Sequence, residues 1–531
     1  MDNKQKIEQI YETIFNVDSK SEGKISPLEF RPYILCALFY RFISENLTNY
    51  INSIQEEAGY IGFNYADLDD DEAETETARK QMVEEKGFFI LPSQLFCNVC
   101  KDCKNDDNLN ERLYNIFRSI EGSAIGRPSE DNIKGIFSDF NVNNPKLAQE
   151  VIPRSKLLAK LLLIIQDIDL DETCNNSDNF GDAYESLITD YAKHEVQKGD
   201  NSFTPKEVSE VLARIVAVDG HEINSCYDPA CGSGSLLLKF SKIIGKKNPF
   251  LRFYGQEIDP NTYNLCRINM FLHNINYDKF DIKLGDTLTE PKHRAEEPFD
   301  AIVSNPPYSN DWAGDKNPVL RNDDRFSPAG ALAPKDKSDL AFVMHILKSL
   351  SDKGTAAVAQ HPGVLFRGGT ENTIRTWLIK NNFIDTVIQL PKNLFDSGGI
   401  APCIIVLRKD AKQDSNILFI DASKLFVKVG KKNKLTEQNM DAIVNAFAER
   451  KEQQYFTRLV SNDDVLTNDS KVLDNDGKVS DDESNLSVSR YVEQEYTREE
   501  IDINQLDLLL DEVTQKGTEL RIKIKEITKD L

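Results

Sequence analysis

Two kinds of hydrophobic pattern divide the chain. Up to about residue 165, apolar residues recur at helical spacing, most densely over 31–51, which read RPYILCALFYRFISENLTNYI. From about residue 180, short apolar runs alternate with helical segments. The pattern predicts an N-terminal helical domain over 1–165 and an α/β domain over 166–455.

Strand-like runs dominate the second region. Seven of them are EINSCY, FLRFYGQEI, FDIKLGD, FDAIVS, GTAAVAQ, IDTVIQL and CIIVLRK. Strands that alternate with helices predict a doubly wound, mostly parallel, Rossmann-like sheet. Ligands of such sheets bind at the carboxyl ends of the strands, where the strand order reverses.

The last eighty residues change character again. Residues 456–484 are polar and predict a flexible linker, and 485–531 predict a helical tail. The tail carries an apolar heptad seam of Leu506, Leu510, Val513, Leu520, Ile524, Ile527 and Leu531. This seam packs either on its own domain or on a helix of a partner, and the linker before it favours the partner.

Composition indicates a soluble protein of about three units, from a length of 531 residues. The chain is 40% hydrophobic and 28% charged, and no run of about 18 apolar residues could span a membrane. The polar N-terminus lacks a signal-peptide core, and the nine cysteines are scattered and odd in number. We expect a cytoplasmic protein without membrane segments.

The net charge of −23 argues against tight nucleic-acid binding by this chain alone, because phosphate contacts require Lys and Arg. Either the acidity is local or a basic partner supplies the nucleic-acid surface.

A cluster of three cysteines, Cys97, Cys100 and Cys103, lies in CNVCKDC. Zinc prefers four ligands, and the fourth would have to come from Cys36 or Cys174. The alternative is that these thiols lie on or under helices of a reduced protein. We predict no metal site.

A glycine loop follows the first predicted strand, in CYDPACGSGSLLL. Asp228 lies at the strand end, and Gly232 and Gly234 allow a tight turn before a helix. The next strand ends at Glu257, placed to bind ribose hydroxyls, and the third ends at Asp286, a second acceptor. No Lys-Ser/Thr pair follows the glycines, so this is not a Walker A loop. The glycines and the two carboxylates together predict a site for an adenosine-containing cofactor without a pyrophosphate.

The fourth strand ends in Asn305-Pro306-Pro307-Tyr308. DPACGSGS followed by NPPY resembles the S-adenosylmethionine-dependent amino-methyltransferases. SFTPKEV (202–208), before the glycine loop, resembles the segment that those enzymes place beside the methionine half of the cofactor. The order of the three motifs resembles that of one class of adenine-N6 DNA methyltransferases. This resemblance implies a cofactor site of Asn201, Ser202, Phe203, Thr204, Pro205, Lys206, Asp228, Gly232, Ser233, Gly234, Ser235, Glu257 and Asp286.

The resemblance extends over nearly the whole chain. LFYRFISEN, GDAYESLI, HPGVLFRGG, LPKNLFDSGGIAPCIIVLRK and NLSVSRYV are similar to the modification (methylation) subunit of type I restriction–modification systems. Family members often carry an acidic or amide residue and an aromatic residue before FTP; here Asn201 keeps the amide, whereas Ser202 lacks the ring. The resemblance implies a DNA substrate, two methylation subunits on one specificity subunit, and an additional restriction (motor) subunit in some complexes.

The resemblance also gives the NPPY motif a chemical role. The exocyclic amine of adenine is a poor nucleophile. The Asn305 side-chain oxygen and the Pro306 carbonyl would each accept a hydrogen bond from one of its two N–H groups. Pro307 would help fix the backbone, and Tyr308 would stack on the extruded base. Asn305, Pro306, Pro307 and Tyr308 are therefore the predicted catalytic residues.

Two alternative functions share these motifs: a protein glutamine-N5 methyltransferase and an inactive cofactor-binding scaffold. Basic residues after NPPY either touch the flipped strand or belong to an exposed loop: Arg321, Arg325, Lys335 and Lys337.

Overall fold

The computed structural model describes residues 25–167, 204–218, 222–245, 248–314, 317–395, 399–410, 412, 414–430, 432–467, 484–494 and 514–521. One compact unit covers Met1–Val492 and a second covers Glu493–Leu531. Within the second unit, residues 514–521 are helical and exposed, and the other residues of the predicted heptad seam lie outside the described part of the chain.

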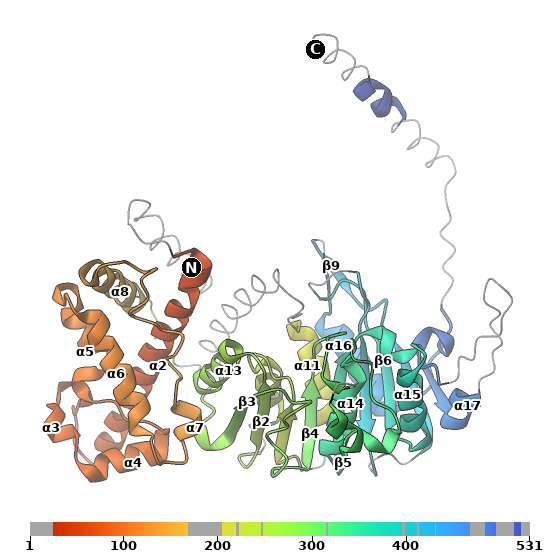
Figure 1. Ribbon diagram of the computed structural model, residues 1–531, viewed down its shortest axis with the longest axis horizontal. Helices are drawn as coiled ribbons and strands as arrows, with labels where there is room; N and C mark the ends of the chain where they lie inside the picture. Colours follow the sequence, from red (N-terminus) through yellow and green to blue (C-terminus); the bar gives the residue numbers. More distant parts are fainter. Residues whose placement is uncertain are drawn as a thin grey trace. The chain divides into compact units, whose positions relative to one another are not determined.

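The N-terminal region is helical, as predicted (Figure 1). Its longest helix begins with a capping box, in which Ser26 and Glu29 exchange hydrogen bonds between side chain and backbone. The helices are α2 (Pro27–Glu57), α3 (Asp70–Ala73), α4 (Glu76–Lys86), α5 (Phe96–Asp102), α6 (Leu109–Ser123), α7 (Glu130–Ile133) and α8 (Val151–Gln166).

The predicted cysteine cluster lies on α5 and the turn after it. Cys100 and Cys103 are buried, Cys97 is exposed, and the Cys103 thiol donates to the Cys100 carbonyl at 3.5 Å. Burial raises the pKa of Cys100 to about 12. Cys100 and Cys103 therefore pack as apolar side chains beneath the helices.

A nine-stranded sheet forms the second region, in the order β11-β8-β6-β7-β5-β4-β1-β2-β3. Its strands are β1 (Ser225–Asp228), β2 (Arg252–Glu257), β3 (Phe280–Leu284), β4 (Phe299–Ser304), β5 (Leu350–Gln360), β6 (Ile384–Gln389), β7 (Cys403–Arg408), β8 (Asn416–Asp421) and β11 (Thr457–Ser461). Five neighbouring pairs are parallel, and the β5–β7, β6–β7 and β8–β11 pairs are antiparallel. The sheet is mostly parallel, as predicted, and has two strands more than the sequence pattern indicated.

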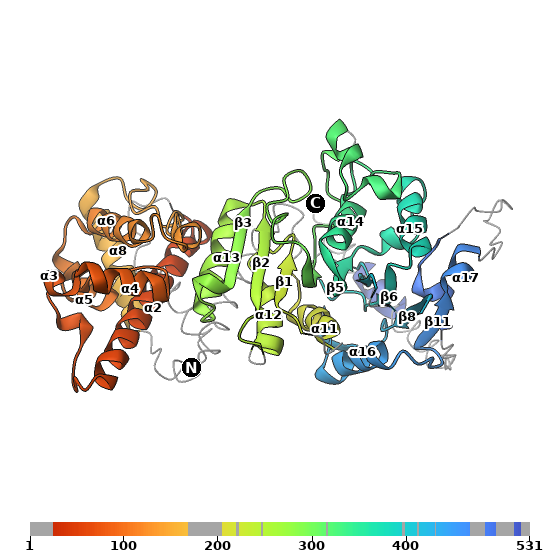
Figure 2. The same cartoon turned by 90° about the horizontal axis from the view of Figure 1, so that it is seen from below.

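Helices cover both faces of this sheet (Figure 2). One buried cluster includes residues of α11, α12, α13 and α16, and the other includes residues of α14 and α15. The helices are α11 (Lys206–Ala217), α12 (Ser235–Phe240), α13 (Pro260–Leu272), α14 (Asp339–Ser349), α15 (Thr370–Lys380), α16 (Glu437–Glu449) and α17 (Asn462–Thr467). A separate hairpin pairs β9 (Val427–Val429) with β10 (Lys432–Lys434).

The sheet continues past residue 455, where we expected the α/β domain to end. Strand β11 pairs with β8 from Thr457 to Ser461, and α17 follows it, so the segment expected to be linker begins as folded structure. Residues 468–483 lie outside the described ranges.

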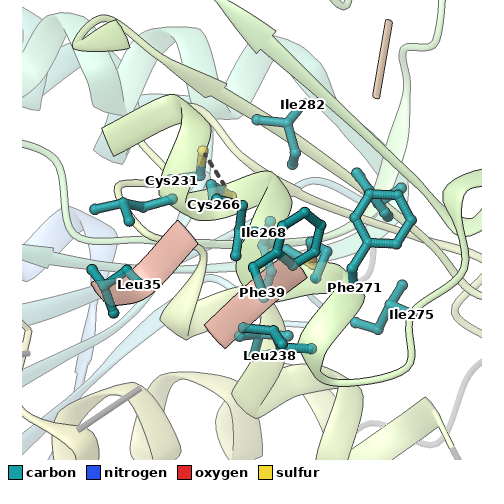
Figure 3. Close-up of a cluster of buried hydrophobic side chains, with 14 of the residues drawn as sticks. Leu35, Phe39, Cys231, Leu238, Cys266, Ile268, Phe271, Ile275 and Ile282 are labelled. Carbon is teal, nitrogen blue, oxygen red and sulfur yellow. Dashed lines mark hydrogen bonds between the residues drawn. The ribbon is translucent and has the colours of Figure 1, made fainter. Parts of the chain in front are cut away.

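The helical region packs against the sheet domain through α13. Phe39 of α2 and Phe271 of α13 lie in one buried cluster with their ring centroids 6.2 Å apart (Figure 3). Arg267 donates to the carbonyls of Asp131 and Lys134 at 3.0 and 2.8 Å. Helix α13 is thus held by the N-terminal helices on one side and by the glycine loop on the other.

Candidate active site

The site forms where the strand order reverses. Strand β1 lies between β4 and β2, so the loop after β1 lies beside the chain that leaves β4. The Ser304 hydroxyl, at the end of β4, donates to Asp228 Oδ1 at 2.7 Å. This hydrogen bond joins the predicted cofactor loop to the predicted catalytic strand.

Asp228 is buried, and only one of its two carboxylate oxygens accepts hydrogen bonds from the described residues. Its Oδ1 accepts from Ser304 and from the Ala230 amide at 3.0 Å, and no hydrogen bond to Oδ2 comes from the described residues. Burial raises the pKa of Asp228 to about 7, against the lowering effect of both hydrogen bonds. A cation beside Oδ2 would offset this cost of ionisation.

The glycine loop turns tightly into α12. Gly232 and Gly234 have φ of +54° and +82°, which glycine adopts at little cost. A methyl group on Gly234 would lie 2.8 Å from Cys266 Sγ, whereas one on Gly232 would meet no atom within 4 Å. Gly234 therefore serves close packing on α13, and Gly232 faces open space. Cys231 of the same loop contacts Cys266, as Figure 3 shows.

Glu257 is bound to this loop. Its Oε2 accepts from the Gly232 amide at 3.0 Å, and its Oε1 accepts from the Asp259 amide at 2.9 Å. Burial raises the pKa of Glu257. Since a carboxylate has about four acceptor positions, it keeps capacity for further donors such as ribose hydroxyls.

Asp286 organises its own turn. It accepts from the Leu288 amide at 3.0 Å and from the Thr289 hydroxyl at 2.8 Å. Its two oxygens are each engaged once, in the loop that leaves β3.

Asn305 is held in one orientation by two side chains. Its Nδ2 donates to Thr204 Oγ1 at 2.8 Å, and its Oδ1 accepts from the Tyr308 hydroxyl at 2.6 Å. Burial raises the pKa of Tyr308, which keeps this hydroxyl protonated as a donor. The predicted site residues Thr204, Asn305 and Tyr308 therefore form one hydrogen-bonded group.

Several other predicted residues lie at or before the starts of α11 and α12. Pro205 caps α11, Lys206 is its first residue, and Ser235 begins α12. The Ser233 carbonyl accepts from Asn269 at 3.0 Å. Asn201, Ser202 and Phe203 lie outside the described residues.

The sequence motifs did not predict the aromatic and charged side chains that lie around Tyr308. The rings of His361 and Phe395 lie 6.3 and 6.2 Å from the Tyr308 ring, centroid to centroid. Buried Asp339 accepts from the Ser309 amide at 3.1–3.2 Å, and Arg367 contacts His361 Nδ1 at 3.1 Å. His361 and Phe395 follow the ends of β5 and β6, so the strand-end rule that located Asn305 would have found them.

The basic residues after NPPY divide into two groups. Arg325 is buried and bonded to Asp323 and to the carbonyls of Thr287 and Leu288, so both alternatives, contact with the flipped strand and an exposed loop, are wrong for this residue. Arg321 and Lys335 are exposed, and half-buried Lys337 pairs with Asp336.

Comparisons with known proteins match this architecture. Residues 175–500 match the N-6 DNA Methylase family, and residues 10–165 match the HsdM N-terminal domain. The chain is 44% identical to the type I restriction enzyme MpnII methylase subunit of Mycoplasma pneumoniae, over 98% of this chain and 95% of the relative. It is 29% identical to the MjaVIII methylase subunit of Methanocaldococcus jannaschii, over 75% of this chain and 70% of the relative.

Among solved structures, the type I restriction-modification methyltransferase subunit from Streptococcus thermophilus is similar. It aligns with a TM-score of 0.77 at 28% identity, over 92% of this chain and 99% of the other. The chain therefore belongs to the N-6 DNA methylase family, among the methylase subunits of type I restriction enzymes.

Proposed function

We propose that this subunit transfers a methyl group from S-adenosylmethionine to N6 of an adenine flipped out of the duplex. The observation that carries the proposal is the hydrogen-bonded group Thr204–Asn305–Tyr308 at the end of β4. It lies next to Ser304, which binds the carboxylate of the cofactor loop. An amide acceptor and a cofactor loop thus meet at the switch point of the sheet.

The residues of the loop fit the cofactor by their chemistry. Gly232 leaves room beside its backbone, Glu257 has unused acceptor positions for ribose hydroxyls, and buried Asp228 has an oxygen suited to a cationic group. Asp286 adds a further acceptor at the end of β3. When bound, S-adenosylmethionine supplies an electrophilic methyl group.

Asn305 and Pro306 activate the amine in this proposal. A carbonyl oxygen has two lone pairs, so Asn305 Oδ1 can accept from Tyr308 and still accept one N6–H. The Pro306 carbonyl, to which no described residue donates, accepts the other N6–H. Because Thr204 fixes the amide and the two prolines fix the backbone, both acceptors are preorganised.

Tyr308 would hold the flipped base. The rings of His361 and Phe395 lie 6.3 and 6.2 Å from its ring, and these neighbours would hold the Tyr308 ring for stacking on the base. A flipped base is required because an amine inside a duplex cannot reach a methyl donor.

A specificity subunit would supply most of the DNA surface. The net charge of −23 disfavours tight phosphate binding by this chain alone, and buried Arg325 does not present its charge to a DNA strand. We therefore assign base readout to a separate specificity subunit that binds two copies of this chain, joined in some complexes by a restriction subunit.

The complex would act in the cytoplasm. Among the described residues, no helix is long and apolar enough to cross a membrane.

The test is methyl transfer in a reconstituted complex of this chain with its specificity subunit. With labelled S-adenosylmethionine and duplex DNA, Asn305→Ala should lower the transfer rate by at least about 100-fold, as expected when a preorganised electrostatic contact is lost. Binding of the cofactor should remain within threefold. Transfer by Asn305→Ala at the unaltered rate would contradict the proposal.

A further inference from the structure

A second cluster of ligand-type side chains contains none of the predicted methylation residues. It consists of Asp281 on β3, and His293 and Glu296 in the loop between β3 and β4. His293 Nδ1 lies 3.7 Å from Asp281 Oδ2 and 3.8 Å from Glu296 Oε2. All three ligand atoms lie within 4.8 Å of one another.

His293 is almost fully buried, and one of its nitrogens lacks a partner. The Nε2 atom is 3.0 Å from the Gly255 carbonyl and donates to it, so the neutral imidazole presents the lone pair of Nδ1 as a metal ligand. Nδ1 has no hydrogen-bond partner although it is buried. An unpaired buried acceptor destabilises the folded state, so the position of Nδ1 beside two carboxylates favours a bound ligand at this point.

The spacing of the three atoms fits a metal better than direct hydrogen bonds. Distances of 3.7 and 3.8 Å are too long for a hydrogen bond from Nδ1 to either carboxylate. Ligands of a tetrahedral zinc ion, each about 2.1 Å from the metal, are about 3.4 Å apart. The distances from His293 Nδ1 to the two carboxylates, 3.7 and 3.8 Å, exceed this spacing by about 0.3 and 0.4 Å.

The surroundings of the cluster resemble the outer shell of a metal site. The Gly255 carbonyl fixes the ring of His293 through its other nitrogen, as partners of metal-binding histidines commonly do. Lys283 binds the other oxygen of Asp281 at 3.1 Å, leaving Oδ2 directed at His293. Glu296 is partly exposed, which gives solvent access for a fourth ligand.

We propose that Asp281, His293 and Glu296 bind a divalent transition metal, zinc in particular, in a structural site. An imidazole with two carboxylates suits zinc and its neighbours better than calcium or magnesium, which prefer oxygen ligands alone. The ion fastens the loop from β3 to β4 onto β3 itself and, through Gly255, onto β2. That loop also carries Asp286, so the metal steadies one wall of the methylation site without entering its chemistry.

Zinc binding to the full-length, metal-stripped protein tests this site by calorimetry and by metal analysis after dialysis. The cysteines could bind zinc on their own, so the comparison is with variants. Wild type should bind one more equivalent of zinc than His293→Gln or Glu296→Gln. Glu290→Gln, a matched control in the same loop whose carboxylate pairs with Lys292, should bind as wild type.

Thermal unfolding gives a second readout that does not depend on activity. Added zinc should raise the midpoint of wild type and Glu290→Gln by at least a few degrees more than that of Glu296→Gln, because a ligand of the folded state stabilises it. Glu296 is partly exposed, so its variant should fold even if His293→Gln does not. Equal zinc stoichiometry in wild type and Glu296→Gln would overturn the proposal, as would a wild type that binds none.

Discussion

At the scale of single residues, the orientation of Asn305 depends on Thr204. The resemblance implied a cofactor role for Thr204, whereas in the structure its hydroxyl oxygen accepts a hydrogen bond from Asn305 Nδ2 at 2.8 Å. This contact fixes which end of the amide presents the oxygen.

Replacing Thr204 by Val should therefore lower kcat about 10- to 100-fold, because a small misplacement of a reacting contact is costly. The KM for the cofactor should change less than threefold, and Thr204→Ser should restore most of the rate. Steady-state kinetics of the reconstituted complex measures both constants. A loss that falls on cofactor KM alone, with kcat intact, would show that Thr204 binds cofactor and does not position Asn305.

Asp228 makes stability depend on pH. Its pKa is about 7 in the folded protein, against an ordinary value of 3.8. Between these values the folded state holds a proton that the unfolded state releases, so the contribution of this group to stability falls as pH rises from about 4 to about 7.

In the Asp228→Asn variant, the side chain at position 228 is an amide and does not ionise. Without cofactor, its melting temperature relative to wild type should increase between pH 5 and pH 7 and level off above about pH 7, measured by thermal unfolding in matched buffers. Parallel pH profiles for the two proteins would contradict the raised pKa.

At the scale of elements, the strand–loop–helix unit around Gly234 couples the cofactor loop to α13. An added methyl group on Gly234 would press against Cys266 and Met270, whereas one on Gly232 meets open space. Both glycines have positive φ, so each alanine variant loses stability from the strained backbone conformation in the same way.

Gly234→Ala should consequently lose about 1–3 kcal/mol more stability than Gly232→Ala, the usual range for overpacking. Gly232→Ala should instead lose cofactor affinity, since its methyl group occupies the space beside the loop. Denaturant unfolding and cofactor titration separate the two effects. Equal losses of stability in both variants would argue against the packing role of Gly234.

Sequence patterns predicted the elements around the site better than the outer sheet. The glycine loop and NPPY were recognisable because turns and preorganised acceptors restrict residue type locally. Strand β8 was missed because its buried run of Ile417–Ile420 is too short to have a clear period. Strand β11 was missed because it buries mainly Thr457 at the edge of the sheet, and an edge strand keeps a polar sequence.

Contacts between distant segments could not be read from the sequence. Arg325 looked like an exposed cation, but Asp323, Thr287 and Leu288 enclose it, and two of these residues belong to the loop after β3. The group around Tyr308 likewise combines residues that follow three different strands. Such partners depend on strand order, which periodicity alone does not fix.

At the scale of the whole molecule, the chain forms two compact units. Residues Met1–Val492 form one compact unit, and the unit Glu493–Leu531 follows it. Within the second unit, Leu520 is exposed on a helical segment, which favours contact with a partner chain.

A chain that ends at Val492 should therefore keep its unfolding midpoint within about 2 °C and its cofactor affinity, yet fail to copurify with the specificity subunit. In the full chain, Leu520→Asp should weaken that association, whereas Glu519→Gln on the neighbouring position should not. Size-exclusion chromatography of the mixed subunits measures complex formation by the truncated chain and by the Leu520→Asp variant. A truncated chain that still forms the complex would place the docking surface elsewhere.

The central claim is that Asn305 enables methylation of adenine N6 in DNA. The most direct test is base-modification sequencing of DNA from cells that express this chain with its specificity subunit, beside Asn305→Ala and the surface control Asn322→Ala. We predict N6-methyladenine within a split, two-part sequence in wild type and in Asn322→Ala, and none in Asn305→Ala. Methylation that persists in Asn305→Ala, or is absent from wild type with the specificity subunit present, would contradict this account.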